Sequence, residues 1–160
     1  MQNAKLKKGF GLLEVLIGLG ILSVAFFALL TVSRSILQVS RAATYSLSAD
    51  FLLEEGVEAI RSIRDRNWTE DIATLPDNFY LYFDETLSRW ESTTTPEVIE
   101  GTFTRELAIS DVYRDGDDDI AASGTLDPGT KKFVVTVTWQ GTNATTTRSM
   151  SVYLTNYFND

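Results

Sequence analysis

Carboxylates are the residues of this chain with the clearest capacity for chemistry, and they are densest between Asp111 and Asp119, where five of nine residues are aspartate. Asp115, Asp117 and Asp119 have the one-three-five spacing of an EF-hand calcium loop. The sixth position of that pattern is isoleucine instead of glycine, and the twelfth is leucine instead of glutamate, so the EF-hand interpretation fails. Two interpretations stay open: a looser calcium site, in which a cation relieves repulsion between carboxylates, and a solvated connector.

A second acidic group lies at residues 54–58, where Glu54, Glu55 and Glu58 are close in sequence. Such a group is compatible with a metal or acid-base site, but no partner with a defined spacing accompanies it, and a solvated helix face is favoured. The chain has no histidine and no cysteine, which excludes thiol nucleophiles, disulfides, thiolate or imidazole metal sites and imidazole proton transfer. We therefore expect a protein that is not an enzyme and has no cofactor, calcium excepted.

Glu14 stands apart from these groups because it lies alone in an apolar segment. Residues 10–33 are nearly all apolar or small, and Glu14 is the only charged residue between Lys8 and Arg34. At about 1.5 Å of rise per residue this segment spans roughly 36 Å, enough to cross a hydrocarbon core of about 30 Å. Three lysines within residues 1–9 predict a cytoplasmic N-terminus, with everything after Arg34 on the other side of the membrane.

Three interpretations of this segment compete. A cleaved secretory signal would use a small-residue site such as Ser23-Val24-Ala25, and a plain single-pass anchor would need no particular residue inside it. Neither explains Glu14, because an ionised carboxylate in hydrocarbon is costly and is usually retained for a partner. A carboxylate close enough to the membrane surface to stay hydrated is the simplest alternative.

The residues around Glu14 supply the third interpretation. The run Lys7-Lys8-Gly9-Phe10-Gly11-Leu12-Leu13-Glu14-Val15-Leu16 closely resembles the processing site of type IV prepilins and pseudopilins. That site has a short basic leader ending in glycine, then phenylalanine, then glutamate as the fifth mature residue of an apolar helix. The resemblance implies that prepilin peptidase cleaves between Gly9 and Phe10 and methylates the new Phe10 amine. It also implies that Glu14 pairs with the Phe10 amine of a neighbouring subunit during filament assembly.

The same resemblance implies a structural role and a set of partners. The chain resembles minor pilins and minor pseudopilins, whose partners are prepilin peptidase, other pilin subunits, the assembly platform and, before assembly, the lipid of the cytoplasmic membrane. The alternatives are a minor pseudopilin of a type II secretion system and a filament-tip binding module for adhesion or DNA uptake. Nucleic acid is disfavoured because the formal net charge is -8. Several pseudopilins bind calcium in a C-terminal loop, which keeps the calcium interpretation of residues 111–119 open.

Two departures from the family pattern affect the expected structure. Thr31 stands near the position where many major pilins have a proline, so no proline kink is predicted. The absence of cysteine rules out the C-terminal disulfide loop of many type IV pilins. Gly18 and Gly20 have two open interpretations, local loosening of the helix and close packing of helices.

Residues 34–67 continue the helical pattern beyond the apolar segment. Apolar side chains recur three or four residues apart, which predicts one apolar stripe on an amphipathic helix. The members of the stripe are Ile36, Val39, Ala43, Leu47, Leu53, Val57 and Ile60. On the polar side, Glu58 and Asp65 are each spaced for a helical ion pair with Arg61.

From residue 68 onward the period changes to that of strands. We predict strands over residues 78–83, 102–113, 131–139 and 146–155, with residues 89–92 returning as the hairpin partner of the first. Asp127-Pro128-Gly129 predicts a type II turn before residue 131. We expect the core to be filled by Trp90, Phe103, Phe133 and Trp139. An exposed adhesive patch is the alternative to a core position for Trp68, Tyr80, Tyr82 and Trp90. Asn67 and Asn143 begin Asn-x-Thr sequons that could accept sugar.

Together these elements predict an α+β fold with pilin-like layout, in which the second half of a long N-terminal helix packs on an antiparallel sheet of four or five strands. The expected organisation is a basic leader (1–9), a transmembrane and filament-core helix (10–33), an amphipathic helix continuing it (34–67) and a globular β domain (68–160). The leader holds three of the 14 basic residues, so the chain from Phe10 onward has 11 basic against 22 acidic side chains.

Overall fold

The computed structural model describes residues 11–141 and 144–158. The chain forms two compact units, Met1–Ala43 and Thr44–Asp160. Helix α1 (Gly11–Arg66) contributes to both, and a short π-helix, η1 (Trp68–Ile72), follows it. The strands are β1 (Asn78–Asp84), β2 (Arg89–Thr93), β3 (Val98–Ile99), β4 (Phe103–Arg114), β5 (Ile120–Ala121), β6 (Thr125–Gln140) and β7 (Thr145–Thr155).

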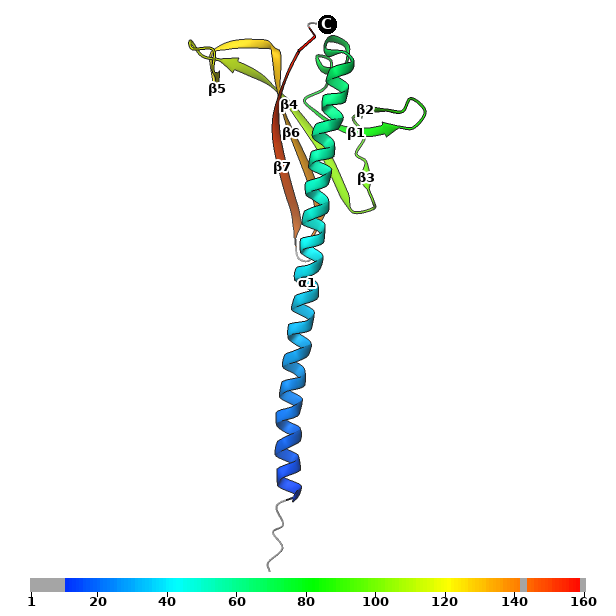
Figure 1. Cartoon of the computed structure of the whole chain (residues 1–160), viewed down its shortest axis with the longest axis vertical. Helices are drawn as coiled ribbons and strands as arrows, with labels where there is room; N and C mark the ends of the chain where they lie inside the picture. The colour runs from blue at the N-terminus through cyan, green and yellow to red at the C-terminus, as the bar shows by residue number, and fades with distance from the viewer. Residues whose placement is uncertain (1–10, 142–143, 159–160) are drawn as a thin grey trace, which may run out of the picture. The chain divides into compact units, whose positions relative to one another are not determined.

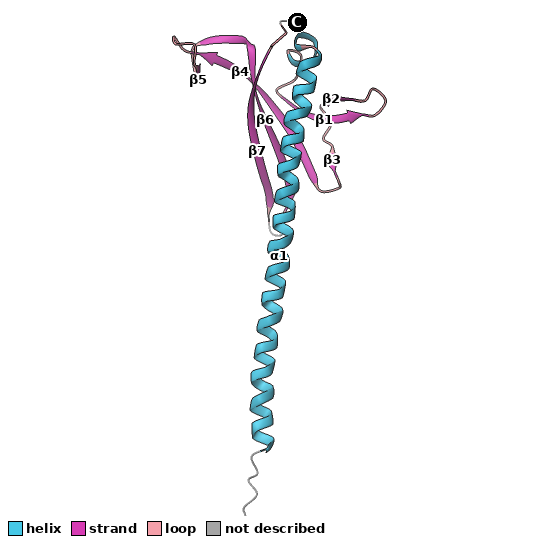
Figure 2. Cartoon of the chain, in the orientation of Figure 1, coloured by secondary structure: helices cyan, strands magenta, loops and turns pink. Residues whose placement is uncertain are grey.

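The strands form one antiparallel sheet in the order β2-β1-β4-β6-β7, with β3 and β5 also paired to β4 (Figure 2). An α+β fold with a long N-terminal helix is therefore confirmed, but the sheet has seven strands, more than the four or five predicted. The two additional strands, β3 and β5, are two residues long, too short to show a period in the sequence. Each lies in a hairpin with β4.

The four predicted strands and the hairpin are all present. β1 and β2 pair through Phe83 opposite Trp90, and β4, β6 and β7 lie within a residue or two of their predicted ends, except that β6 begins at Thr125 instead of Lys131. At the turn between β3 and β4, Glu100 and Gly101 both have positive φ, 49° and 65°, as a type I′ turn requires. The hydrogen bond from Thr102 N to Ile99 O, 3.0 Å, closes that turn.

The predicted type II turn at Asp127-Pro128-Gly129 is wrong. A type II turn needs positive φ at Gly129, whereas the positive-φ glycines among the described residues are Gly101 and Gly124. The tripeptide lies within β6, where the register with β4 jumps from Lys131 opposite Asp111 to Asp127 opposite Val112. Proline lacks the ladder N–H, so it is accommodated in a bulge, and the strand continues beyond it.

The core of the second unit lies between the C-terminal part of α1 and one face of the sheet (Figure 1). Of the predicted stripe, Leu53, Val57 and Ile60 are buried, but Ile36, Val39, Ala43 and Leu47 are exposed. The stripe prediction is wrong for these four because helical periodicity alone cannot tell which turns of a helix pack against other elements. The buried helical residues are Ala49, Leu53, Gly56, Val57, Ala59, Ile60 and Ile63.

The predicted bulky residues do fill this core. Phe103, Phe133 and Trp139 are buried, and Trp90 is half-buried and packs against the edge of the core. Trp68 is also buried, which favours the core interpretation over an adhesive patch for that residue. Tyr80 and Tyr82 are half-buried on β1.

A cap and a cluster of ion pairs define the end of α1. Asn67 Oδ1 accepts a hydrogen bond from Glu70 N, 2.8 Å, at the start of η1. Arg66 donates to Asp71 Oδ2 at 2.6 Å and to the carbonyl of Trp90 at 3.1 Å, and its guanidinium lies 3.3 Å from Glu91 Oε2. These contacts raise the pKa of Arg66 and join the helix end to η1 and β2.

Candidate functional site

The processing motif is described only from Gly11 onward. Gly9 and Phe10, the predicted cleavage and methylation residues, lie outside the described residues, as does the Asn143 sequon. Glu14 lies in the first described turn of α1, and its side chain is exposed. It is the only carboxylate of the first unit.

The apolar side chains of α1 that surround Glu14 are not covered by any other described residue. Every residue from Gly11 to Ala43 is exposed, and the large apolar side chains range from 82% exposed at Leu12 to 40% at Leu30. Among the described residues one helix, α1, is long and apolar enough to cross a membrane. Apolar surface of this extent needs lipid or protein around it, because soluble monomers rarely expose such patches.

The hydroxyls inside this apolar stretch are satisfied by the helix itself. Ser23 Oγ donates to the carbonyl of Leu19 at 2.7 Å, and Thr31 Oγ1 donates to that of Phe27 at 2.9 Å. These bonds allow a hydroxyl to enter hydrocarbon without a lost hydrogen bond. Glu14 has no such partner among the described residues, so its charge requires either water or a second molecule.

The two helix glycines do not interrupt α1. Gly18 and Gly20 lie within a continuous α-helix that also passes through Thr31, as the absence of proline predicts. A Cβ at either glycine would meet nothing within 4 Å. Among the described residues, therefore, no close contact requires glycine at either position.

The acidic segment 111–119 covers the end of β4, residues 111–114, and the hairpin loop to β5, residues 115–119. Asp115 Oδ1 accepts hydrogen bonds from the backbone N–H groups of Asp117 and Asp119, at 3.0 and 3.1 Å. Asp115 N also donates to the carbonyl of Asp119 at 3.0 Å, and Asp118 has a φ of 66°. Asp115 thus organises the turn between β4 and β5.

These contacts bear on the predicted calcium ligands Asp115, Asp117 and Asp119. Within residues 11–141 and 144–158, no three carboxylates come close enough together to hold a metal ion. The arrangement fits the solvated-connector interpretation, and calcium binding stays a prediction.

Two ion pairs join β4 to β6 close to this loop. Arg114 Nε lies 2.7 Å from Asp127 Oδ2 across the strands β4 and β6, and its NH1 donates to the carbonyl of Asp118 at 2.7 Å. The hydrogen bond from Arg114 holds the pKa of Asp127 below its usual value, and that of the Arg114 guanidinium is raised. Lys131 Nζ pairs with Asp111 Oδ1 at 2.5 Å.

The helix carboxylates at residues 54–58 do not assemble a site. Glu54 and Glu58 are exposed, and Glu58 pairs with Arg61 at 2.5 Å, as predicted. Asp65 pairs with its neighbour Arg64 instead of Arg61. Glu55 has a different partner, Arg105 on β4, whose NH1 lies 2.9 Å from Glu55 Oε2.

Arg105 is the feature of this region that the sequence reasoning missed. Its side chain is only 3% exposed, it donates to the carbonyl of Leu52, and its guanidinium lies 5.1 Å from the centroid of the Trp90 ring. Its Nε is buried with no partner among the described residues. The signal was present, because Arg105 has the same parity as the inward-facing Phe103 and Leu107.

Comparison with known proteins finds no matching family model, no matching curated protein and no matching solved structure.

Proposed function

We propose that this chain is a minor type IV pilin or pseudopilin, a structural and non-enzymatic subunit of a helical surface filament. In this proposal prepilin peptidase cleaves between Gly9 and Phe10 and methylates the Phe10 amine. The N-terminus starts in the cytoplasm, α1 anchors the subunit in the cytoplasmic membrane, and the acidic second unit lies on the far side until the subunit is extracted into the filament.

The observation that carries the proposal is the combination of Glu14 with the uncovered helix that bears it. The hydroxyls Ser23 and Thr31 are satisfied within α1, whereas Glu14 has no partner among the described residues. A carboxylate kept in an apolar helix indicates a partner. The amine created by cleavage before Phe10 supplies an opposite charge, and it would belong to a neighbouring subunit.

The energetics favour assembly as the step that pairs these charges. An unpaired charge in a low-dielectric environment costs several kcal/mol. A well-placed opposite charge can offset about that amount. Packing of the exposed apolar side chains of α1 against those of neighbouring subunits would supply cohesion, and charge pairing would set the axial register. Glu14 and Phe10 therefore act in assembly, and neither acts as a catalyst.

The proposal is tested by Glu14→Gln in the organism that makes the filament, with Glu54→Gln as the matched control on an exposed part of α1. We expect Glu14→Gln to insert in the membrane and to be processed normally but to be depleted at least about tenfold from sheared filaments, since a tenfold change needs only about 1.4 kcal/mol. Glu54→Gln should be incorporated like the wild type. Normal incorporation of Glu14→Gln would contradict the assembly mechanism.

Processing has a separate readout. Gly9→Val should leave an uncleaved chain that retains its three leader lysines and the unmethylated Met1 end, which mass spectrometry of the purified protein detects. Recovery of N-methylated Phe10 from that variant would contradict cleavage at this junction.

A further inference from the structure

The outer face of the sheet carries a second candidate site. Ser110 on β4, Lys132 on β6 and Tyr153 on β7 lie directly opposite one another across the three strands. The neighbouring row, in which Phe133 is fully buried, faces α1. Because side chains alternate between the faces of a sheet, the row that contains Lys132 projects away from α1.

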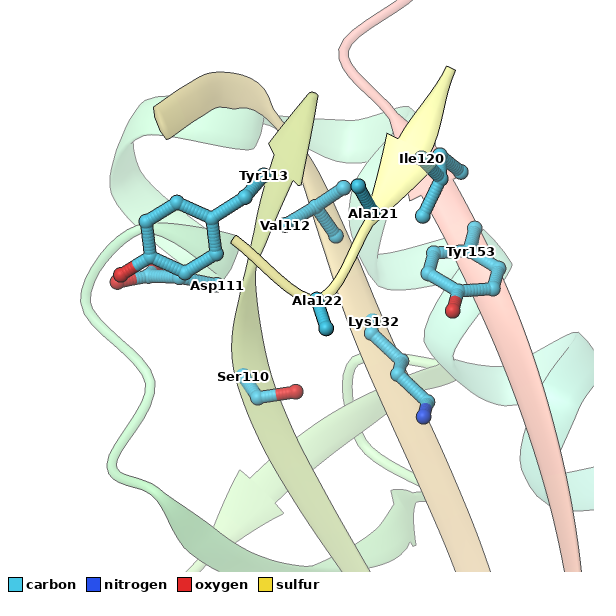
Figure 3. A pocket seen from close by; sticks show the side chains of 9 residues that line it. All are labelled: Ser110, Asp111, Val112, Tyr113, Ile120, Ala121, Ala122, Lys132 and Tyr153. Carbon is cyan, nitrogen blue, oxygen red and sulfur yellow. The ribbon is translucent and has the colours of Figure 1, made fainter. Parts of the chain in front are cut away.

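The hairpin of β4 and β5 turns this part of the face into a cavity of about 450 Å³, within the size range of small-molecule sites. Figure 3 shows Ile120, Ala121 and Ala122 beside Lys132 and Tyr153, whereas Asp111 and Tyr113 point to the other side of β4. Val112 is buried beneath this hairpin at 3% exposure. The cavity thus combines apolar side chains with Ser110, Lys132 and Tyr153 from three strands, and Asp111 and Tyr113 of β4 also border it.

Lys132 is the unusual member of this group. Among the described residues of the second unit, every basic side chain but Lys132 has a carboxylate within 4 Å. The second unit has 9 basic and 21 acidic residues, so acidic partners are abundant. Asp111, which also borders the cavity, is already paired with Lys131. The Lys132 ammonium instead lies 5.9 Å from the centroid of the Tyr153 ring, and the positive charge remains available to an anion.

The side chains around Lys132 indicate which class of anion the cavity would bind. Tyr153 is 44% exposed, and its ring offers a flat surface on which the C–H face of a sugar ring can stack. The hydroxyls of Ser110 and Tyr153 both donate and accept hydrogen bonds, as sugar hydroxyls require. The strongly acidic unit would repel a polyanion, whereas a ligand with one carboxylate would be held by Lys132 alone.

We propose that this cavity binds a carboxylated sugar, a hexuronic acid or a glycan residue of that type. The carboxylate would pair with the Lys132 ammonium, the ring would lie against Tyr153, and Ser110 would bind a ring hydroxyl. The proposal does not depend on filament assembly, because all the residues concerned lie within the second unit.

The test uses the full chain in detergent micelles, titrated by calorimetry with three probes. D-galacturonate has the ring and the charge, D-galactose has the ring alone, and acetate has the charge alone. We expect galacturonate to bind at least about tenfold more tightly than either of the other two, because losing one charge-assisted hydrogen bond corresponds to roughly that factor.

Two neighbouring lysines provide matched variants. Lys132→Met should weaken galacturonate binding at least about tenfold, whereas Lys131→Met should leave it unchanged, because Lys131 is already paired with Asp111. Tyr153→Leu should weaken the binding of galacturonate, which stacks on the ring. It should leave the weaker binding of acetate unchanged. Circular dichroism checks that each variant is folded.

Several outcomes would overturn the proposal. Absence of galacturonate binding to the wild-type chain overturns it without reference to any variant. Acetate binding as tightly as galacturonate would show a simple carboxylate site, such as one for an acidic peptide side chain, and would overturn the sugar assignment. Equal losses in Lys131→Met and Lys132→Met would remove Lys132 from the site.

Discussion

Arg105 shows how a buried charge is tolerated at the centre of this fold. A fully buried arginine normally requires a complete set of partners, because desolvating an ion costs several kcal/mol. Here Glu55 supplies one carboxylate, Leu52 a carbonyl and Trp90 a ring face, while Nε has no partner among the described residues. The partner Glu55 is itself 47% exposed, so the two members of this ion pair differ in what they lose when the other is removed.

That difference predicts unequal effects of mutation on stability. Glu55→Ala should destabilise the second unit by about 1–3 kcal/mol, because the Arg105 guanidinium would stay buried with its charge uncompensated. Arg105→Met should change stability by less than about 1 kcal/mol, because Glu55 can be hydrated and a flexible apolar side chain fills the space. Thermal or urea unfolding of the full chain in micelles measures both.

Glu54→Ala is the matched control for this pair. Glu54 is an exposed helical carboxylate beside Glu55, and its removal should change stability by no more than about 0.5 kcal/mol. If Arg105→Met proved more destabilising than Glu55→Ala, the ion pair would be a net contributor to stability, and the account of Arg105 as a costly buried charge would be wrong.

At the scale of elements, α1 approaches the sheet closely at one residue. Gly56 is buried in the helix, and a Cβ at that position would lie 2.8 Å from Val135 Cγ1 and 3.0 Å from Arg105 Cδ. Alanine is about 1 kcal/mol better than glycine within a helix, so glycine here is explained by the space between α1, β4 and β6.

Gly56→Ala is therefore expected to destabilise the second unit by about 1–3 kcal/mol through overpacking, despite its better helix propensity. Val135 is β-branched and fully buried, so it cannot move aside at little cost. Addition of Val135→Ala to Gly56→Ala should recover part of that loss, which a double-mutant cycle of unfolding free energies measures. Gly18→Ala, where a Cβ meets nothing within 4 Å, should leave unfolding of the second unit unchanged. Equal stability of Gly56→Ala and the wild type would contradict a steric role for this glycine.

The elements also show which parts of the fold follow from local pattern. β6 was predictable because Phe133, Val135, Val137 and Trp139 recur at every second position among threonines and β-branched residues, and all four are buried. The bulge at Pro128 was not predictable, because the sequence Pro-Gly is equally typical of a turn. Only the partner strand β4 determines whether strand pairing continues beyond Pro128. For the same reason Ile36 has the period of a buried residue but is exposed.

The candidate sites divide in the same way. Glu14 could be identified as a candidate site residue from the sequence, because the apolar segment and the motif that single it out lie within a few residues of it. The Lys132 cavity could not, because Ser110, Lys132 and Tyr153 lie far apart in the chain and are brought together only by strand register. Arg105 is an intermediate case. Its inward-facing position could be predicted from the alternation along β4, but its ion pair with Glu55 could not.

At the scale of the whole molecule, the two units have contrasting surfaces. The described part of the first unit is a helix with exposed apolar side chains, and the second has its own core and 21 acidic residues. All the buried residues of α1 lie between Ala49 and Ile63, which is within the second unit. The second unit therefore contains everything that its core requires.

From this we expect residues 44–160 to fold alone as a soluble protein, with the near-ultraviolet circular dichroism of a fixed environment around Trp68, Trp90 and Trp139. A fragment of residues 58–160 keeps all three tryptophans but lacks Ala49, Leu53, Gly56 and Val57, which are buried against the sheet. Loss of Leu53 and Val57, at about 2–5 kcal/mol for each large buried side chain, is comparable to a typical total stability of about 5–15 kcal/mol, and it also exposes the sheet face that they cover. The shorter fragment should therefore lose the tryptophan signal and aggregate. A folded 58–160 fragment would show that the sheet does not depend on α1, and an unfolded 44–160 fragment would show that the core extends into residues 11–43.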